Sequence, residues 1–137
     1  MVFNPLKERS LERFKSPQSP VEMTVGKAVP IASHYYQVRI GGDFQGRNAA
    51  VPNAQRTYVD AGASVRADAG AQGDGGRVIV WADEQTQSFG AISARGGAAG
   101  GDGGNIETSG AFLDMQGQVD TRAPLGRVGN LLLDPTN

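Results

Sequence analysis

Residues 92–108 read ISARGGAAGGDGGNIET, and this stretch contains the unit that recurs along the chain. It begins with the apolar residue Ile92, continues into a glycine cluster and ends in a second apolar run around Ile106. The same order starts upstream at Val65 and downstream at Val119, so the three leading apolar residues are each 27 positions apart. An apolar residue that returns at a fixed long period indicates a repeat architecture.

Each repeat is predicted to hold a strand, a turn, a second strand and a glycine turn. Strands this short do not form stable hairpins alone, so we expect each one to pair in parallel with its equivalent one repeat later. The predicted inward rows are Val65–Ile92–Val119 and Val78–Ile106–Leu131. The sequence therefore predicts an all-β fold, a parallel β-solenoid of about four coils stacked at the usual strand spacing. The predicted second strands of the repeats, with an earlier strand before them, are 77–81, 105–108, 130–133 and 38–40.

Composition divides the chain near Val38. Residues 38–137 contain all but one of the 20 glycines, whereas residues 1–37 contain Gly26 alone and most of the prolines. We expect 38–137 to form the repeat domain, with a loop inserted over 44–56. Residues 1–37 are predicted to be irregular or to contain a short helix over 5–15 and a strand over 21–25, outside the regular repeats.

Bulk composition excludes several classes of protein. There is no cysteine, which excludes a disulfide framework and thiol chemistry. The net charge of −1 gives no reason to expect a polyanion partner. No apolar run approaches the length of a membrane span, and the charged N-terminal stretch is not a signal peptide.

The order of motifs over residues 38–137 resembles the repeat region of filamentous-haemagglutinin-like exoproteins of two-partner secretion systems. The resemblance is carried by GGRVIVWAD at 75–83, FGAISARGG at 89–97, GDGGNIETSG at 101–110 and LLLDPTN at 131–137, with IGGDFQG at 40–46 before them. It implies a right-handed parallel β-helix, an extracellular or cell-surface location, an outer-membrane transporter for the full-length family, and a role in adhesion to a host-surface or carbohydrate receptor. It transfers no catalytic residue.

No catalytic, cofactor or metal site is predicted. The Gly-Asp-Gly-Gly corners at 73–76 and 101–104 could suggest calcium, but Asp as a turn residue bonded to its own backbone explains them better. They also lack the Gly-Lys-Ser/Thr of a phosphate loop. His34 is the single histidine, which is too few for a metal site or a catalytic triad.

Three further sets of residues are candidate sites. The acid pairs Asp83/Glu84 and Glu107/Asp114 could act as the carboxylates of a polysaccharide-cleaving enzyme, the aromatic pair Trp81/Phe89 could bind a sugar, and Arg66, Arg95 and Arg122 could form a basic stripe. We expect Trp81 and Phe89 to pack in the core or at a corner, and we expect the three arginines to form a solvated face.

Three functions remain open from the sequence. The first is a structural adhesin segment without enzymatic activity, the second a carbohydrate-binding or carbohydrate-cleaving β-helix module, and the third a truncated, non-functional remnant of an adhesin gene. For the first, open solenoid ends predict self-association through the strand at 130–133, relieved by Leu132→Lys.

Overall fold

The computed structural model describes residues 21–22 and 37–135. These residues are almost entirely strand and turn, with one short 3-10 helix, η1, and the strands lie in parallel sheets. The all-β prediction is therefore confirmed. The described elements are β1 (Val21–Glu22), β2 (Gln37–Ile40), η1 (Phe44–Gly46), β3 (Arg56–Val59), β4 (Ser64–Arg66), β5 (Arg77–Trp81), β6 (Gln85–Ser88), β7 (Ala91–Ser93), β8 (Asn105–Gly110), β9 (Phe112–Met115), β10 (Val119–Asp120) and β11 (Asn130–Pro135).

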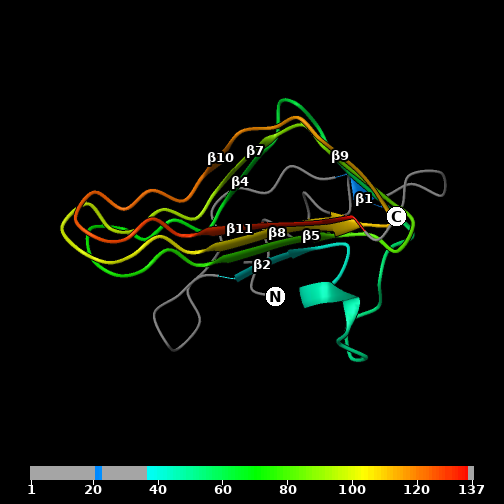
Figure 1. Ribbon diagram of the computed structural model, residues 1–137, viewed down its shortest axis with the longest axis horizontal. Helices are drawn as coiled ribbons and strands as arrows, with labels where there is room; N and C mark the ends of the chain where they lie inside the picture. The colour runs from blue at the N-terminus through cyan, green and yellow to red at the C-terminus, as the bar shows by residue number, and fades with distance from the viewer. Residues whose placement is uncertain (1–20, 23–36, 136–137) are drawn as a thin grey trace.

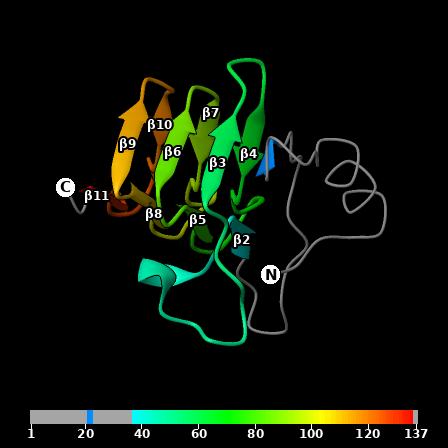
Figure 2. The same cartoon turned by 90° about the vertical axis from the view of Figure 1, so that its right-hand side faces the viewer.

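The described strands form three sheets. The first sheet has the order β1-β3-β6-β9, the second β10-β7-β4 and the third β11-β8-β5-β2. From β3 to β11 the chain visits the first, second and third sheets in turn, three times over, and each strand pairs in parallel with its equivalent on the next round. Figures 1 and 2 show the rounds lying side by side, with β9, β10 and β11 together at one end.

The predicted register of the repeats is confirmed. Val65 pairs with Ile92 and Ile92 with Val119 in the second sheet. In the third sheet a single row runs from Val38 through Val78 and Ile106 to Leu131.

One apolar cluster fills the space enclosed by the sheets. The cluster contains the inward residues of the second and third sheets, together with residues from the first sheet and from the corners. Aliphatic β-branched side chains suit these positions because they pack well on a pleated surface. Its buried members are Val38, Ile40, Val59, Ala63, Val65, Ala67, Val78, Val80, Ile92, Ala94 and Ile106.

The first-sheet strands β3, β6 and β9 were missed by the two-strand repeat predicted above, because their inward residues are partly polar. Thr57 and Thr86 are buried and point inward. The Thr57 hydroxyl donates to the carbonyl of Trp81 at 2.6 Å, and the Thr86 hydroxyl donates to that of Ser109 at 2.7 Å. These bonds satisfy hydroxyl groups that would otherwise be costly to bury.

Glycine allows the corners of successive rounds to approach closely. The amide of Gly104 donates to the carbonyl of Ala94 at 2.8 Å, and a Cβ at Gly104 would collide with the carbonyl oxygen of Gly76 in the preceding round. Gly129 meets Gly104 in the same way one round later. A residue with a side chain would therefore push these rounds apart.

The N-terminal predictions are only partly within the described residues. Of the strand expected over 21–25, residues 21–22 form β1, which pairs in parallel with β3 in the first sheet, and residues 23–25 lie outside the described residues. Gln37, placed in the N-terminal segment, begins β2. The predicted helix over 5–15 and His34 lie outside the described residues, and the division at Val38 stays a prediction.

Candidate functional site

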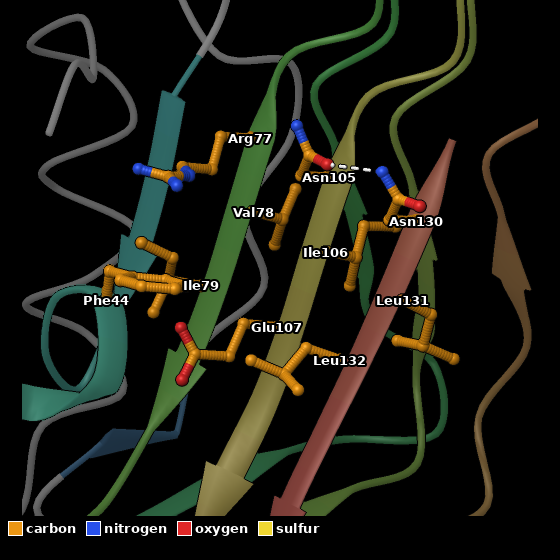
Figure 3. A pocket seen from close by; sticks show the side chains of 10 residues that line it. All are labelled: Phe44, Arg77, Val78, Ile79, Asn105, Ile106, Glu107, Asn130, Leu131 and Leu132. Atoms are coloured by element: carbon orange, nitrogen blue, oxygen red, sulfur yellow. Dashed lines mark hydrogen bonds between the residues drawn. The ribbon is translucent and has the colours of Figure 1, made fainter.

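A pocket of about 260 Å³ lies on the outer face of the third sheet, beside η1. Figure 3 shows Phe44 on one side of it and the strands β5, β8 and β11 beneath it. The outward residues Ile79, Glu107 and Leu132 form one row across these strands. The pocket is lined by Phe44, Arg77, Val78, Ile79, Asn105, Ile106, Glu107, Asn130, Leu131 and Leu132.

The segment that carries η1 is the loop predicted over 44–56, and it folds onto this outer face. Asp43 caps η1 by accepting from the amide of Phe44 at 2.7 Å, and it also accepts from the side chain of Asn48 at 2.6 Å. Arg39 adds an ion pair at 3.1 Å. Burial tends to raise the pKa of Asp43, but these hydrogen bonds and the nearby Arg39 outweigh it and lower that pKa.

Trp81 anchors the same loop. Its indole N–H donates to Asp83 at 3.0 Å, and its ring lies against the backbone of Gly46, where a Cβ would come within 2.5 Å of ring carbons. Gly46 also has a φ of 62°, which a side chain tolerates poorly. The side chain of Asn53 joins the loop to the corner by donating to Asp83 at 2.9 Å.

Glu107 is the buried acid of the pocket, with 3% of its surface exposed. Its carboxylate accepts from the amide of Gln45, with distances of 3.1 and 3.2 Å to the two oxygens. Burial raises the pKa of Glu107; the Gln45 hydrogen bond opposes that rise, and the charge of Asp134 adds to it. Glu107 therefore holds η1 to the sheet.

A polar row borders the pocket at the start of the strands. Arg77, Asn105 and Asn130 occupy equivalent positions on β5, β8 and β11. The guanidinium of Arg77 lies 4.8 Å from the ring centre of Phe44, a cation–π contact, and the Asn130 amide donates to Asn105 at 3.0 Å. An aromatic ring, an arginine and amides beside an apolar floor are groups that can bind a small polar ligand.

The Gly-Asp-Gly-Gly corners differ in detail from the prediction. Asp74 does not bond its own turn: it accepts from the amide of Asp102 in the next round, at 2.8 Å. Asp102 in turn accepts from the amide and the guanidinium of Arg127, each at 2.9 Å, and these bonds lower its pKa. The corner acids therefore link rounds to each other. Among the described residues, no three His, Cys, Asp or Glu side chains are grouped as a metal site.

The structure separates the acid pairs considered as catalytic. Asp83 accepts from Trp81 and Asn53, while Glu84 forms an exposed ion pair with Arg56 at 3.6 Å. Glu107 lies on β8 in the third sheet and Asp114 on β9 in the first. Asp83, Glu84 and Glu107 therefore each have a structural contact of their own.

Trp81 and Phe89 also pack against different parts of the chain. Trp81 is buried against the η1 loop, whereas Phe89 packs edge-on against Tyr58 with ring centres 5.6 Å apart.

The three arginines considered as a basic stripe are exposed, and each has a polar partner. Arg122 bonds Asp120 at 2.9 Å, Arg95 lies 3.5 Å from the same carboxylate, and Arg66 donates to Ser64. The hydrogen bond from Arg122 is the main reason that the pKa of Asp120 falls to about 2.

The outward row of the third sheet was not recognised from the sequence. The available signal was the alternation in 77–81, 105–109 and 130–134, which places every second residue outside. That alternation alone could not show that a loop from another part of the chain covers Ile79 and Glu107.

Comparison with known proteins yields only short matches, and no family model matches the chain. The chain is 56% identical over 43 residues to Protein YdeP of Escherichia coli K12, and equally to that of Shigella flexneri; the match covers 31% of this chain and 6% of those proteins. It is 52% identical over 43 residues to the uncharacterized oxidoreductase Rv2900c of Mycobacterium tuberculosis, covering 31% of this chain and 5% of that one. In the part of the chain that the structure describes, no helix is long and apolar enough to cross a membrane.

Proposed function

We propose that this chain is a structural segment of a secreted bacterial surface adhesin, built as a right-handed parallel β-helix of the filamentous-haemagglutinin type and without enzymatic activity. The observation that carries the proposal is the parallel register of the repeats. Val65, Ile92 and Val119 align without a shift, and the chain returns to each of the three sheets in the same order. In a stack of this kind each round contacts only its neighbours and repeats their geometry.

The polar contacts support a structural role over a catalytic one. The corner acids Asp74 and Asp102 bond the following round, and Glu107 holds the η1 loop. Retaining and inverting glycosidases need two carboxylates that flank a scissile bond. Here the acids are engaged in holding neighbouring segments, which is the use expected of a scaffold.

The same proposal places the chain outside the cell, on a full-length protein exported through an outer-membrane transporter, with a host-surface or carbohydrate receptor as its partner. The matches to YdeP and to a protein named as an oxidoreductase extend over 43 residues, about a twentieth of those proteins. The proposal therefore draws nothing from their names.

The pocket beside η1 favours carbohydrate binding as a second candidate. Its border of Arg77, Asn105 and Asn130 offers donors and acceptors next to the ring of Phe44. Binding would need no change in the scaffold role, because the pocket lies on the outer face.

An adhesion assay tests the first proposal directly. Beads coated with the purified chain should adhere to epithelial monolayers above beads coated with albumin, and a panel of polysaccharides should show no new reducing ends. Adherence no better than albumin would refute the adhesin role. Release of reducing ends that disappears in Glu107→Gln would refute the absence of enzymatic activity.

A glycan array tests the second candidate with a matched pair of variants. Asn105→Ala removes a pocket amide, whereas Gln87→Ala removes an amide from β6 in the first sheet. Glycan binding that is lost only in Asn105→Ala supports the pocket. No binding, or equal loss in both variants, argues against it.

A further inference from the structure

The guanidinium of Arg77, at the rim of the pocket beside η1, has no carboxylate partner within the described residues. Most of the other described arginines form an ion pair with an acid, namely Arg39, Arg56, Arg95, Arg122 and Arg127. Arg77 instead lies over the ring of Phe44, 4.8 Å from the ring centre, and makes no hydrogen bond in this part of the chain. Its N–H donors are therefore available to a ligand.

The structure holds this cation in place. Arg77 begins β5, where it pairs with Gln37 on one side and Asn105 on the other. Phe44, which it covers, is fixed by the turn of η1. The next residue, Gln45, has a φ of 54° and is the one non-glycine residue with a positive φ among the described residues. Such strain persists where the surroundings fix it, and here the Gln45 amide bonds the buried carboxylate of Glu107.

The rest of the rim also offers donors. The bond of 3.0 Å from Asn130 uses the side-chain oxygen of Asn105, and the amide nitrogen of Asn105 has no partner within the described residues. Glu107 lies on the row below, 3% exposed and bonded to Gln45, so its carboxylate is directed to the η1 loop. A guanidinium with an amide N–H beside it matches an oxyanion.

The remaining walls of the pocket are mainly apolar. Phe44 is on one side, and the outward side chains of Ile79 and Leu132 lie on the strands beneath, as Figure 3 shows. The volume of about 260 Å³ equals that of roughly nine water molecules at about 30 Å³ each, so the ligand is compact. A hexose would place hydroxyl groups against this floor, where they would lose water without gaining partners.

We propose that the pocket beside η1 binds a small carboxylic acid with an apolar body, such as an aryl or branched-chain acid. The carboxylate lies on Arg77, because a guanidinium binds it through two parallel N–H···O bonds. The body lies over Ile79 and Leu132, beside Phe44. This inference does not depend on the adhesin role, and it competes with the carbohydrate candidate for the same pocket.

Calorimetric titration with two probes of similar shape tests the choice of ligand. The purified chain should bind benzoate saturably, with a dissociation constant of about 1 mM or tighter. Benzyl alcohol, which has the ring but no charge, should bind at least about tenfold more weakly. No saturable binding of benzoate in the millimolar range, or equal binding of the two probes, would overturn the proposal.

Variants of one arginine test the site, with circular dichroism as the check on folding. Arg77→Gln should weaken benzoate binding by about tenfold or more. Arg77→Lys keeps the charge on Phe44 but loses the fork, so it should stay folded and bind several-fold more weakly than the wild type. The matched control is Arg47→Gln, because Arg47 follows η1 and is exposed but does not line the pocket. Unchanged binding in both Arg77 variants, or an equal loss in Arg47→Gln, would overturn the site.

Nuclear magnetic resonance separates this inference from the carbohydrate candidate. Benzoate should shift the amide signals of Phe44, Arg77 and Asn105, and shifts confined to Arg95 and Arg122 would place the anion elsewhere and overturn the proposal. Glucuronate carries a carboxylate on a hydroxylated ring and should bind more weakly than benzoate, while glucose should not bind. Tighter binding of either sugar than of benzoate would refute the apolar body and support the carbohydrate candidate. The adhesion assay can fail without changing any of these results.

Discussion

The inward row of the third sheet predicts that the same apolar truncation costs very different amounts at different positions. Ile106 lies in the middle of the row and is 1% exposed, whereas Leu131 lies at its open end and is 43% exposed. Both pack on the same face of neighbouring strands. Ile106→Ala and Leu131→Ala therefore compare one kind of change in a closed and an open environment.

The magnitudes follow from burial. Ile106→Ala removes a fully buried side chain and leaves a cavity, so we expect the free energy of unfolding to fall by about 3–4 kcal/mol. Leu131→Ala leaves no enclosed cavity and removes a side chain that already keeps nearly half of its surface in water, so we expect a loss of about 1 kcal/mol. A domain of this size has about 5–15 kcal/mol of stability in total, so both variants should remain folded.

Urea unfolding measures both losses. The single tryptophan, Trp81, is 8% exposed and reports on the η1 loop and the third sheet, while far-ultraviolet circular dichroism reports on the strands. The titrations should be run at concentrations below self-association, where Leu131 is uncovered. Equal losses for the two variants would refute the reasoning, because they would mean that the open end is as tightly packed as the middle of the stack.

Two further predictions concern the corners and the acids. Gly104→Ala should lower the unfolding free energy by about 3 kcal/mol or more, because its Cβ would meet the carbonyl of Gly76, whereas Gly70→Ala, with nothing within 4 Å of its Cβ, should be neutral or slightly stabilising in the same urea titration; equal effects would count against close packing of the rounds. Stability should fall as the pH drops from about 4 towards 2, because Asp120 has a folded-state pKa of about 2 against an ordinary 3.8. Asp120→Asn should flatten that fall. Glu107, whose pKa is raised, should act in the opposite sense: its contribution is lost as the pH rises through its folded-state pKa, and Glu107→Gln should remove that change.

Several residues show why part of the fold was predictable. Val65, Ile92 and Val119 repeat at a fixed spacing, and an apolar residue at that period has to be buried against its equivalents. The glycine corners could also be predicted from the sequence, because backbones that approach closely exclude side chains. Both features depend on local sequence repeated at a distance.

The first sheet was not predictable in the same way. Its inward positions include Thr57, Thr86 and Ser88, which are buried but polar. Their strands therefore lack the apolar alternation that marks a half-buried strand. The carbonyls that accept from Thr57 and Thr86 lie in the third sheet, at Trp81 and Ser109. Such partners become apparent only after the chain has folded.

The candidate site shows the same division between sequence and tertiary structure. The sequence by itself determined the repeat, the parallel register and the inward rows, because burial of apolar residues at one period allows few other arrangements. Only the tertiary structure decided that the loop from Asp43 to Arg56 covers Ile79 and that Glu107 is buried beneath Gln45. These features depend on where a non-repeating segment packs, which no local pattern encodes.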